Sequence, residues 1–172
     1  MGQRLTGATP VTAHVEEHAM LPMDMERLWE EHCADEFARH DVDATMSTMV
    51  EQPYVLHLPT LIGGQGQEGV RRFYAEEFIP KLPADIALEP VSRTVGAERI
   101  VDEMIVTMTH DREVSWILPE VAATGARIEI PLVAVVRFAD GRIAHEHLWW
   151  DQASVLIQVG LLEPSGLPVQ SR

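Results

Sequence analysis

Histidines and an aspartate near the end of the chain have the clearest capacity for proton-transfer chemistry. His145 and His147 are two residues apart, and Asp151 follows shortly after. Alternate residues of a β-strand point to the same side, so a strand here would place both imidazoles on one face. An imidazole in an apolar cavity can accept and donate a proton near neutral pH. We therefore predict His147 as a proton-transfer group and Asp151 as its orienting carboxylate or base.

Two further histidines are candidates because each falls in or beside a segment with strand-like alternation. His110 shares a predicted inward face with Asp102, so it could also form an acid–base pair. His57 could approach from across the interior and donate a hydrogen bond that polarises a substrate carbonyl. The remaining histidines are expected at the surface: His14, His18, His32 and His40.

Aromatic, methionine and histidine side chains near these groups could form the wall of a binding pocket. Their structural alternative is ordinary core packing, and Asp151 could instead cap a helix that begins after it. The predicted substrate contacts are Tyr54, Trp116, Trp149, Met104, Met108 and His145.

Other kinds of chemistry have less support in the sequence. His145-x-His147 also has the spacing of two metal ligands on a strand, but no suitable Glu follows, so no metal ligand and no cofactor is assigned. Cys33 falls in a predicted helix and is expected to be a small core residue. A serine hydrolase of the G-x-S-x-G type is excluded because that motif does not occur.

The first half of the chain predicts three amphipathic helices. Apolar residues recur every three or four positions from Met25 to Phe37, with Asp24 available as the N-cap. Similar spacing predicts helices over 42–50 and 67–79. The glycine-rich stretch 63–66 lacks the lysine of a phosphate-binding loop and predicts a flexible turn.

After residue 83 the hydrophobic period changes from helical to two, which is typical of strands. Helices followed by long antiparallel strands indicate an α+β fold, with a curved, mainly antiparallel sheet wrapped around the N-terminal helices. Such a cone would have an apolar interior, and the connection 116–126 could line or cover it. The strands are expected as an edge strand at 54–58 and as two hairpins, 86–95 with 99–110 and 128–138 with 143–150.

Length and charge limit the possible functions. The 172 residues correspond to about one domain, expected over 23–164 between a flexible arm at 1–22 and a tail at 165–172. The net charge of −14 disfavours nucleic acid and anionic membranes as partners. No apolar run is long enough for a membrane span and the first twenty residues lack a signal-peptide pattern, so a cytoplasmic location is expected.

The segment from Asp140 through the stretch His145–Leu162 resembles the closing hairpin and C-terminal part of SnoaL-like proteins of the nuclear transport factor 2 (NTF2) superfamily. Tyr54–Gly64, Trp116–Pro119 and Ile130–Val135 extend this resemblance, which covers about residues 24–164. It implies a cone-shaped α+β barrel that is usually dimeric through its outer sheet face. Relatives include cyclases, a dehydratase, an isomerase, an epoxide hydrolase and binding proteins, so the fold does not choose the reaction.

In the cyclases of this family an aspartate and a histidine inside the cone move protons during an aldol closure. The similar positions here are His110, His147 and Asp151. We therefore predict a cofactor-free acid–base enzyme of cyclase, isomerase or dehydratase type, with a small, largely apolar, carbonyl-bearing substrate. One alternative is a non-catalytic domain for small-molecule binding or dimerisation. A second alternative is a metal-dependent enzyme that uses the His145/His147 pair.

Overall fold

The computed structural model describes residues 21–168, so all but two residues of the predicted arm at 1–22 and half of the predicted tail lie outside the described residues. Its strands are β1 (Met49–His57), β2 (Ile62–Gln65), β3 (Ala87–Val95), β4 (Arg99–Thr109), β5 (Arg127–Ala139) and β6 (Arg142–Trp150). Its α-helices are α1 (Pro22–Ala34), α2 (Val42–Ser47), α3 (Gly66–Arg72) and α4 (Gln152–Gln158). No helix in this part of the chain is long and apolar enough to cross a membrane.

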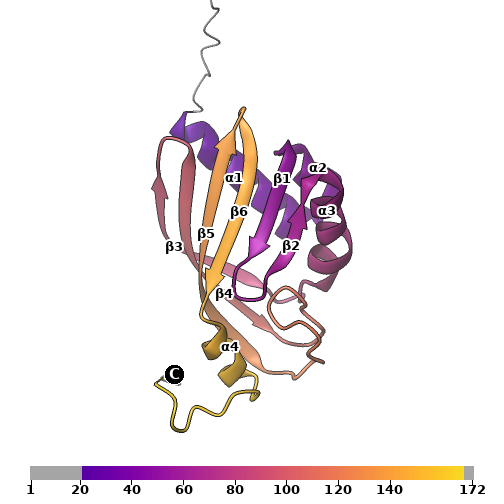
Figure 1. Ribbon diagram of the computed structural model, residues 1–172, viewed down its shortest axis with the longest axis vertical. Coiled ribbons are helices and arrows are strands. Elements are labelled where there is room, and N and C mark those ends of the chain that lie inside the picture. Colours follow the sequence, from indigo (N-terminus) through magenta and orange to yellow (C-terminus); the bar gives the residue numbers. More distant parts are fainter. Residues whose placement is uncertain (1–20, 169–172) are drawn as a thin grey trace, which may run out of the picture.

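The strands form one curved, unclosed sheet in the order β2-β1-β6-β5-β4-β3. Only β1 and β6 pair in parallel, and the other neighbours are antiparallel. Figure 1 shows α1 passing behind the sheet, α2 and α3 beside β1 and β2, and α4 at the far end of β6. This is the α+β arrangement that the sequence predicts, with helices gathered on one face of the sheet.

The helices begin and end at residues whose local chemistry explains their positions. Pro22 occupies the first position of α1, where its missing N–H costs no hydrogen bond. Asp24 therefore lies in the first turn and is not the N-cap that the sequence predicts. Asp41 caps α2 by accepting a hydrogen bond from the Ala44 amide at 3.0 Å. After Ala34 and Arg72 the helices continue in the wider π-helical form, over Asp35–Arg39 and Phe73–Phe78.

The predicted edge strand at 54–58 is longer and lies inside the sheet, between β2 and β6. The edge position belongs to β2, which contains the glycines expected to form a flexible turn. Gly63 is required there because a Cβ atom would lie 1.9 Å from the carbonyl oxygen of Val55. The prediction was wrong because it treated these glycines as a loop, whereas they permit close strand approach.

Both predicted hairpins are present, and β4 presents the expected face to the interior. Its even-numbered residues are buried: Ile100, Asp102, Met104, Val106 and Met108. The side chains of α1 pack against this face and complete one hydrophobic core. The sequence alternation therefore predicts the orientation of this strand correctly.

The alternation fails in β6 because the strand contains a β-bulge. Phe138 of β5 pairs with Ile143, whereas the preceding residue Arg137 pairs with His145, which leaves Ala144 as one extra residue. A single extra residue moves every later side chain to the opposite face. Glu146 is consequently buried and, like Ile143, faces the helices.

Candidate active site

The histidine pair predicted as the centre of the site lies on the outer face of the sheet. The His145 ring stacks on Tyr54 with 4.6 Å between centroids, and the His147 ring lies 5.2 Å from Tyr54 in a tilted orientation. Trp149, on the same face, is 49% exposed. The expectation that these side chains line the interior is wrong, because it assumed a β6 strand without a bulge.

The other predicted catalytic groups are also separated from one another. Asp151 is exposed and accepts a hydrogen bond from the Ala153 amide at 3.0 Å, so it caps α4. His110 is buried beyond the end of β4, where its Nδ1 accepts a hydrogen bond from the Thr124 amide at 3.3 Å. In the described part of the chain, no hydrogen bond joins Asp151 to either His110 or His147.

His57 faces the interior, as expected, but its protonation state differs from the predicted role. Its Nδ1 lies 3.1 Å from the carbonyl oxygen of Ile62, and a carbonyl can only accept, so Nδ1 carries the proton. Burial lowers the pKa of His57 to about 4, so the ring is neutral near pH 7. Its free Nε2 is therefore a hydrogen-bond acceptor and cannot polarise a carbonyl.

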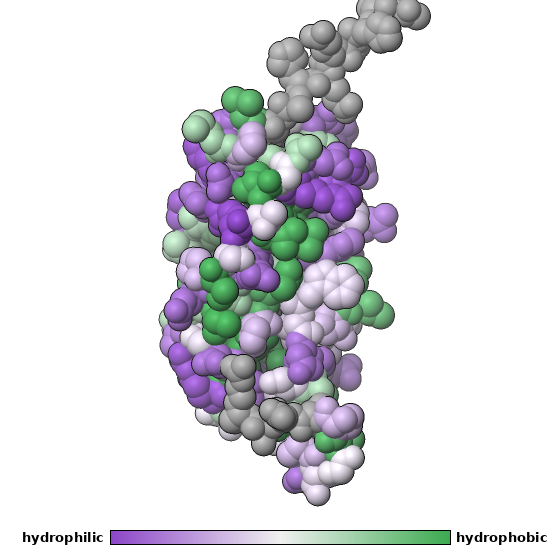
Figure 2. Space-filling view, turned by 90° about the vertical axis from the view of Figure 1, so that its left-hand side faces the viewer, coloured by the Kyte–Doolittle hydropathy of each residue, from purple (hydrophilic) through white to green (hydrophobic). Residues whose placement is uncertain are grey.

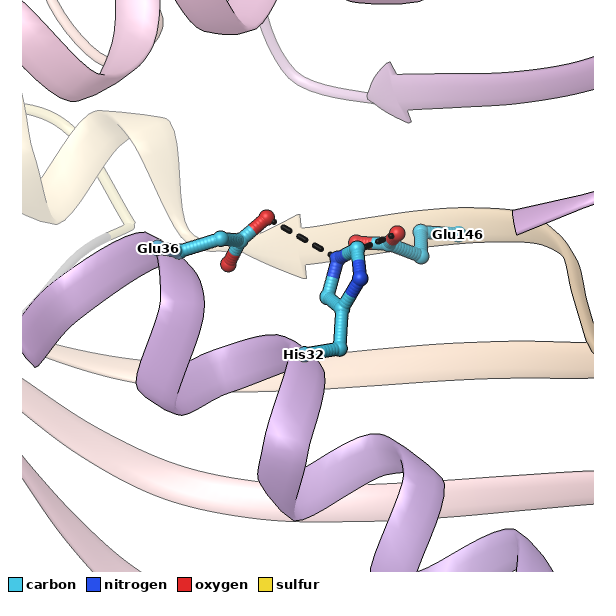
Figure 3. A group of neighbouring side chains, drawn as sticks. All are labelled: His32, Glu36 and Glu146. Atoms are coloured by element: carbon cyan, nitrogen blue, oxygen red, sulfur yellow. Dashed lines mark ion pairs between the residues drawn. The ribbon is translucent and has the colours of Figure 1, made fainter. Parts of the chain in front are cut away.

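A different group of ionisable side chains lies inside the molecule. Figure 3 shows His32 of α1 between the carboxylates of Glu36, one turn further along, and Glu146 of β6. His32 Nε2 lies 3.0 Å from Glu36 Oε1 and 3.1 Å from Glu146 Oε1. The Tyr74 hydroxyl donates to Glu146 Oε1 at 3.2 Å. All four side chains are buried, so they form one acid–base cluster shielded from water.

The orientation of the His32 ring is fixed from its other nitrogen. Thr48 Oγ1 donates its single proton to the Thr45 carbonyl oxygen at 2.7 Å. The hydroxyl must therefore accept a hydrogen bond from His32 Nδ1, which lies 2.6 Å away. The ring also stacks on Trp29 at 5.6 Å. These contacts direct Nε2 at the two carboxylates.

The environment of the cluster changes how its members hold protons. Burial alone would lower the pKa of His32, but the carboxylates of Glu146 and Glu36 raise it to about 10. Burial raises the pKa of Glu36, despite the opposing effect of His32. Burial also raises the pKa of Tyr74 well above its usual range. At neutral pH the cluster thus contains an imidazolium and a carboxyl group that accepts a proton more readily than usual.

Glu36 and Glu146 form the polar part of an otherwise apolar cavity between the helices and the sheet. Two of the predicted substrate contacts, Met104 and Trp116, line the same cavity, whereas Met108 is buried outside it. The cavity has a volume of about 30 Å³, which is room for about two water molecules. A larger occupant therefore requires movement of the cavity wall.

Asp102, predicted as a possible partner of His110, is engaged by other groups. The Trp29 indole donates to its Oδ2 at 2.8 Å, and the Arg93 guanidinium donates to both of its oxygens at 3.1 and 2.8 Å. This paired carboxylate connects α1, β3 and β4. The Asp102 carboxylate therefore links these elements and is not available as a catalytic base.

The cluster also contains the donor atoms that a metal ion would need. Among the described residues, one group of three His, Cys, Asp or Glu side chains brings its ligand atoms within 4.8 Å of one another, and it consists of His32, Glu36 and Glu146. Imidazole nitrogen and carboxylate oxygen suit first-row divalent ions. A set of three ligand atoms that could hold a metal ion is therefore present at this cluster.

Sequence reasoning missed the cluster because its members come from segments that pair only in the folded chain. His32 is expected at the surface, and the prediction that His145 and His147 face the interior puts Glu146, on the opposite face of the strand, outside. A local signal was nevertheless available, since His32 and Glu36 are four residues apart and therefore share one helix face. His32 also lies three residues after Trp29, on the side of α1 that packs inward.

Comparison with known proteins supports the fold. A search of curated proteins found no match. Among solved structures, TsrD from Streptomyces laurentii is 17% identical over 83% of this chain and 99% of its own, with a TM-score of 0.61. A proposed SnoaL-like polyketide cyclase from Jannaschia sp. CCS1 is 17% identical over 80% of this chain and 94% of its own, with a TM-score of 0.62.

An NTF2-like protein of unknown function from Burkholderia pseudomallei K96243 is 20% identical over 80% of this chain and 97% of its own, with a TM-score of 0.59. These identities establish the fold alone. The model of the SnoaL-like domain family matches residues 29–146, which is more than half of the chain. Together with the curved α+β sheet, this match shows that the chain belongs to the SnoaL-like domain family.

Proposed function

We propose that this protein is an acid–base enzyme that moves a proton on a small, largely apolar, carbonyl-bearing molecule held in its interior. The observation that carries the proposal is that two carboxylates of the buried cluster, Glu36 and Glu146, line an otherwise apolar cavity. The proposed reaction is of the cyclase, isomerase or dehydratase type that the family resemblance implies. The proposed site is this buried cluster and no longer the His145/His147 pair.

The energetic cost of the cluster supports a chemical role. Each ion removed from water costs several kcal/mol, and apolar residues of similar volume are often as stable as a buried ion pair. Ionisable groups with strongly shifted pKa values that line a cavity are typical of functional sites. Burial raises the pKa of Glu36, which makes its carboxylate a stronger base than that of an exposed glutamate.

The simplest reaction for this arrangement is enolisation. A carboxylate of Glu36 or Glu146 would remove a proton from the carbon beside the substrate carbonyl. The electron pair of the C–H bond would form the C=C bond of an enolate, and the carbonyl oxygen would gain negative charge. Delivery of the proton to another carbon completes an isomerisation, and its replacement by a proton from water completes an exchange. His32 acts as a positioning residue, since it holds both carboxylates through Nε2.

Exchange of hydrogen for deuterium beside a carbonyl tests this proposal without knowledge of the natural substrate. Cyclic and aryl ketones are incubated with the full chain in D₂O, and the α-proton signals are followed by NMR. We expect catalysed exchange, reduced at least about a hundredfold by Glu36→Gln, the usual minimum effect of losing a general base. Glu31→Gln, an exposed residue on the same helix, is the matched control.

A binding function is the rival from another class. In that case ketones would bind, as measured by calorimetry, but no α-proton would exchange faster than in buffer. Thermal denaturation of each variant separates loss of chemistry from loss of folding. The metal alternative is tested by elemental analysis of protein purified without an affinity tag, where about one equivalent of zinc, iron or manganese would support it.

A further inference from the structure

An aromatic group surrounds His57 beside the interior cavity. The centroid of the His57 ring lies 5.3 Å from that of Trp116 and 5.4 Å from that of Phe73. Phe78 and Trp150 lie within 6.0 Å of the same ring. Trp116 also lines the cavity that contains Glu36 and Glu146. Trp116 therefore contacts both the His57 ring and the cavity of the proposed catalytic site.

Two buried polar atoms in this group lack a hydrogen-bond partner among the described residues, His57 Nε2 and Trp116 Nε1. The Trp116 nitrogen is a donor, whereas His57 Nε2 is an acceptor because Nδ1 carries the proton that bonds to the Ile62 carbonyl. A buried polar atom left without a hydrogen-bond partner destabilises the folded state. The two neighbouring rings therefore offer one donor and one acceptor that together need a complementary group.

The chemistry of that group follows from the two requirements. A carbonyl, ether or carboxylate oxygen accepts but cannot donate to His57, and an ammonium group donates but cannot accept from Trp116. A neutral hydroxyl does both. We propose that His57 and Trp116 form a subsite for a hydroxyl group of the substrate, an inference that rests on the proposed function.

The sheet also places this subsite relative to the carboxylates. Val55 pairs with Glu146 across the β1–β6 ladder, and His57 lies two residues further along β1. Two residues of strand span about 7 Å. The hydroxyl of the proposed hydroxy ketone would therefore lie about 7 Å from the carboxylate end of the site.

Three size-matched ketones test the subsite by calorimetry with the full chain. 4-Hydroxyacetophenone both donates and accepts at its ring substituent, 4-methoxyacetophenone only accepts, and 4-methylacetophenone does neither. We expect the hydroxy compound to bind at least tenfold more tightly than the methoxy compound. His57→Phe, which keeps an aromatic ring, should reduce that ratio to within twofold of one, and Trp116→Phe should lower affinity for the hydroxy compound but not for the methyl compound.

Equal affinity for the three ketones, no measurable binding of 4-hydroxyacetophenone, or a hydroxyl preference that survives both substitutions would overturn the subsite. If the two variants lower thermal stability but leave the ligand ratio unchanged, the two nitrogens hold a structural water and the inference is wrong. Binding is measured here without turnover. A hydroxyl preference without α-proton exchange would therefore contradict the proposed function while supporting the subsite.

Discussion

Burial gives two histidines of this protein opposite protonation states. His32 is held charged by two carboxylates, whereas His57 is held neutral among aromatic rings. The two imidazoles therefore have opposite proton-binding properties inside one core. Neither property is visible in the sequence, because a histidine looks the same at both positions and only the folded surroundings differ.

His57 predicts a loss of stability in mild acid. Its pKa in the folded state, about 4, is lower than the ordinary value of 6.5, so the unfolded chain binds the proton first. The stability that this residue contributes is complete above pH 6.5 and is lost as the pH falls toward 4, by about 3 kcal/mol. Urea denaturation of the wild type and of His57→Phe at pH 7.5 and pH 4.5 measures this change.

Carboxylates titrate in both the wild type and His57→Phe. The relevant quantity is therefore the difference between the two proteins in unfolding free energy lost over this pH interval. We expect the wild type to lose more unfolding free energy than His57→Phe over this interval. An equal loss in the two proteins would show that His57 is not buried in its neutral form.

At the level of elements, the β6 bulge decides which side chains reach the interior. The local signals in the sequence are sufficient for α1, for the two hairpins and for the inward face of β4, because periodicity and turn residues are properties of neighbouring positions. The bulge depends on how β5 and β6 pair, and the central position of β1 depends on its parallel partner β6. These pairings join residues that are far apart in the sequence, so the residue pattern within one segment does not predict them.

Removal of Ala144 tests this role of the bulge. The deletion would remove the extra residue while Phe138 stays opposite Ile143 and Arg137 stays opposite His145, so Glu146 would still face the helices. Because the buried cluster is kept, we expect the unfolding free energy measured by urea denaturation to fall by less than about 3 kcal/mol. Ala144→Gly, which keeps the chain length and the bulge, is the control.

A larger loss in the deletion variant, with Ala144→Gly close to the wild type, would mean that Ala144 belongs to an uninterrupted strand and that its removal turns the later side chains to the opposite face. That result would contradict the inward position of Glu146.

At the level of the whole molecule, the outer sheet face is our proposed dimer interface. It carries half-buried apolar residues of β5, such as Val133 and Val135, beside the exposed Trp149. Seen from the side of β3, hydrophobic residues are also exposed between hydrophilic ones (Figure 2). An exposed apolar sheet face of this kind favours association with a second copy.

Light scattering during size-exclusion chromatography tests the dimer. We expect twice the chain mass for the wild type and a monomer for Val135→Glu, because a two-fold interface would bring the added charge close to its symmetry copy. Met23→Glu adds the same charge to the exposed part of α1 and should leave the dimer intact. A monomeric wild type at high protein concentration would contradict the proposed interface.

The most direct test of the proposed chemistry compares one inward and one outward residue of β6. Glu146→Gln and His147→Gln change neighbouring positions, and α-proton exchange of a bound ketone is measured for each by NMR in D₂O. We predict that Glu146→Gln slows exchange at least about a hundredfold, while His147→Gln stays within about threefold of the wild type. The opposite pattern, with exchange dependent on His147 and indifferent to Glu146, would contradict an acid–base site inside the sheet.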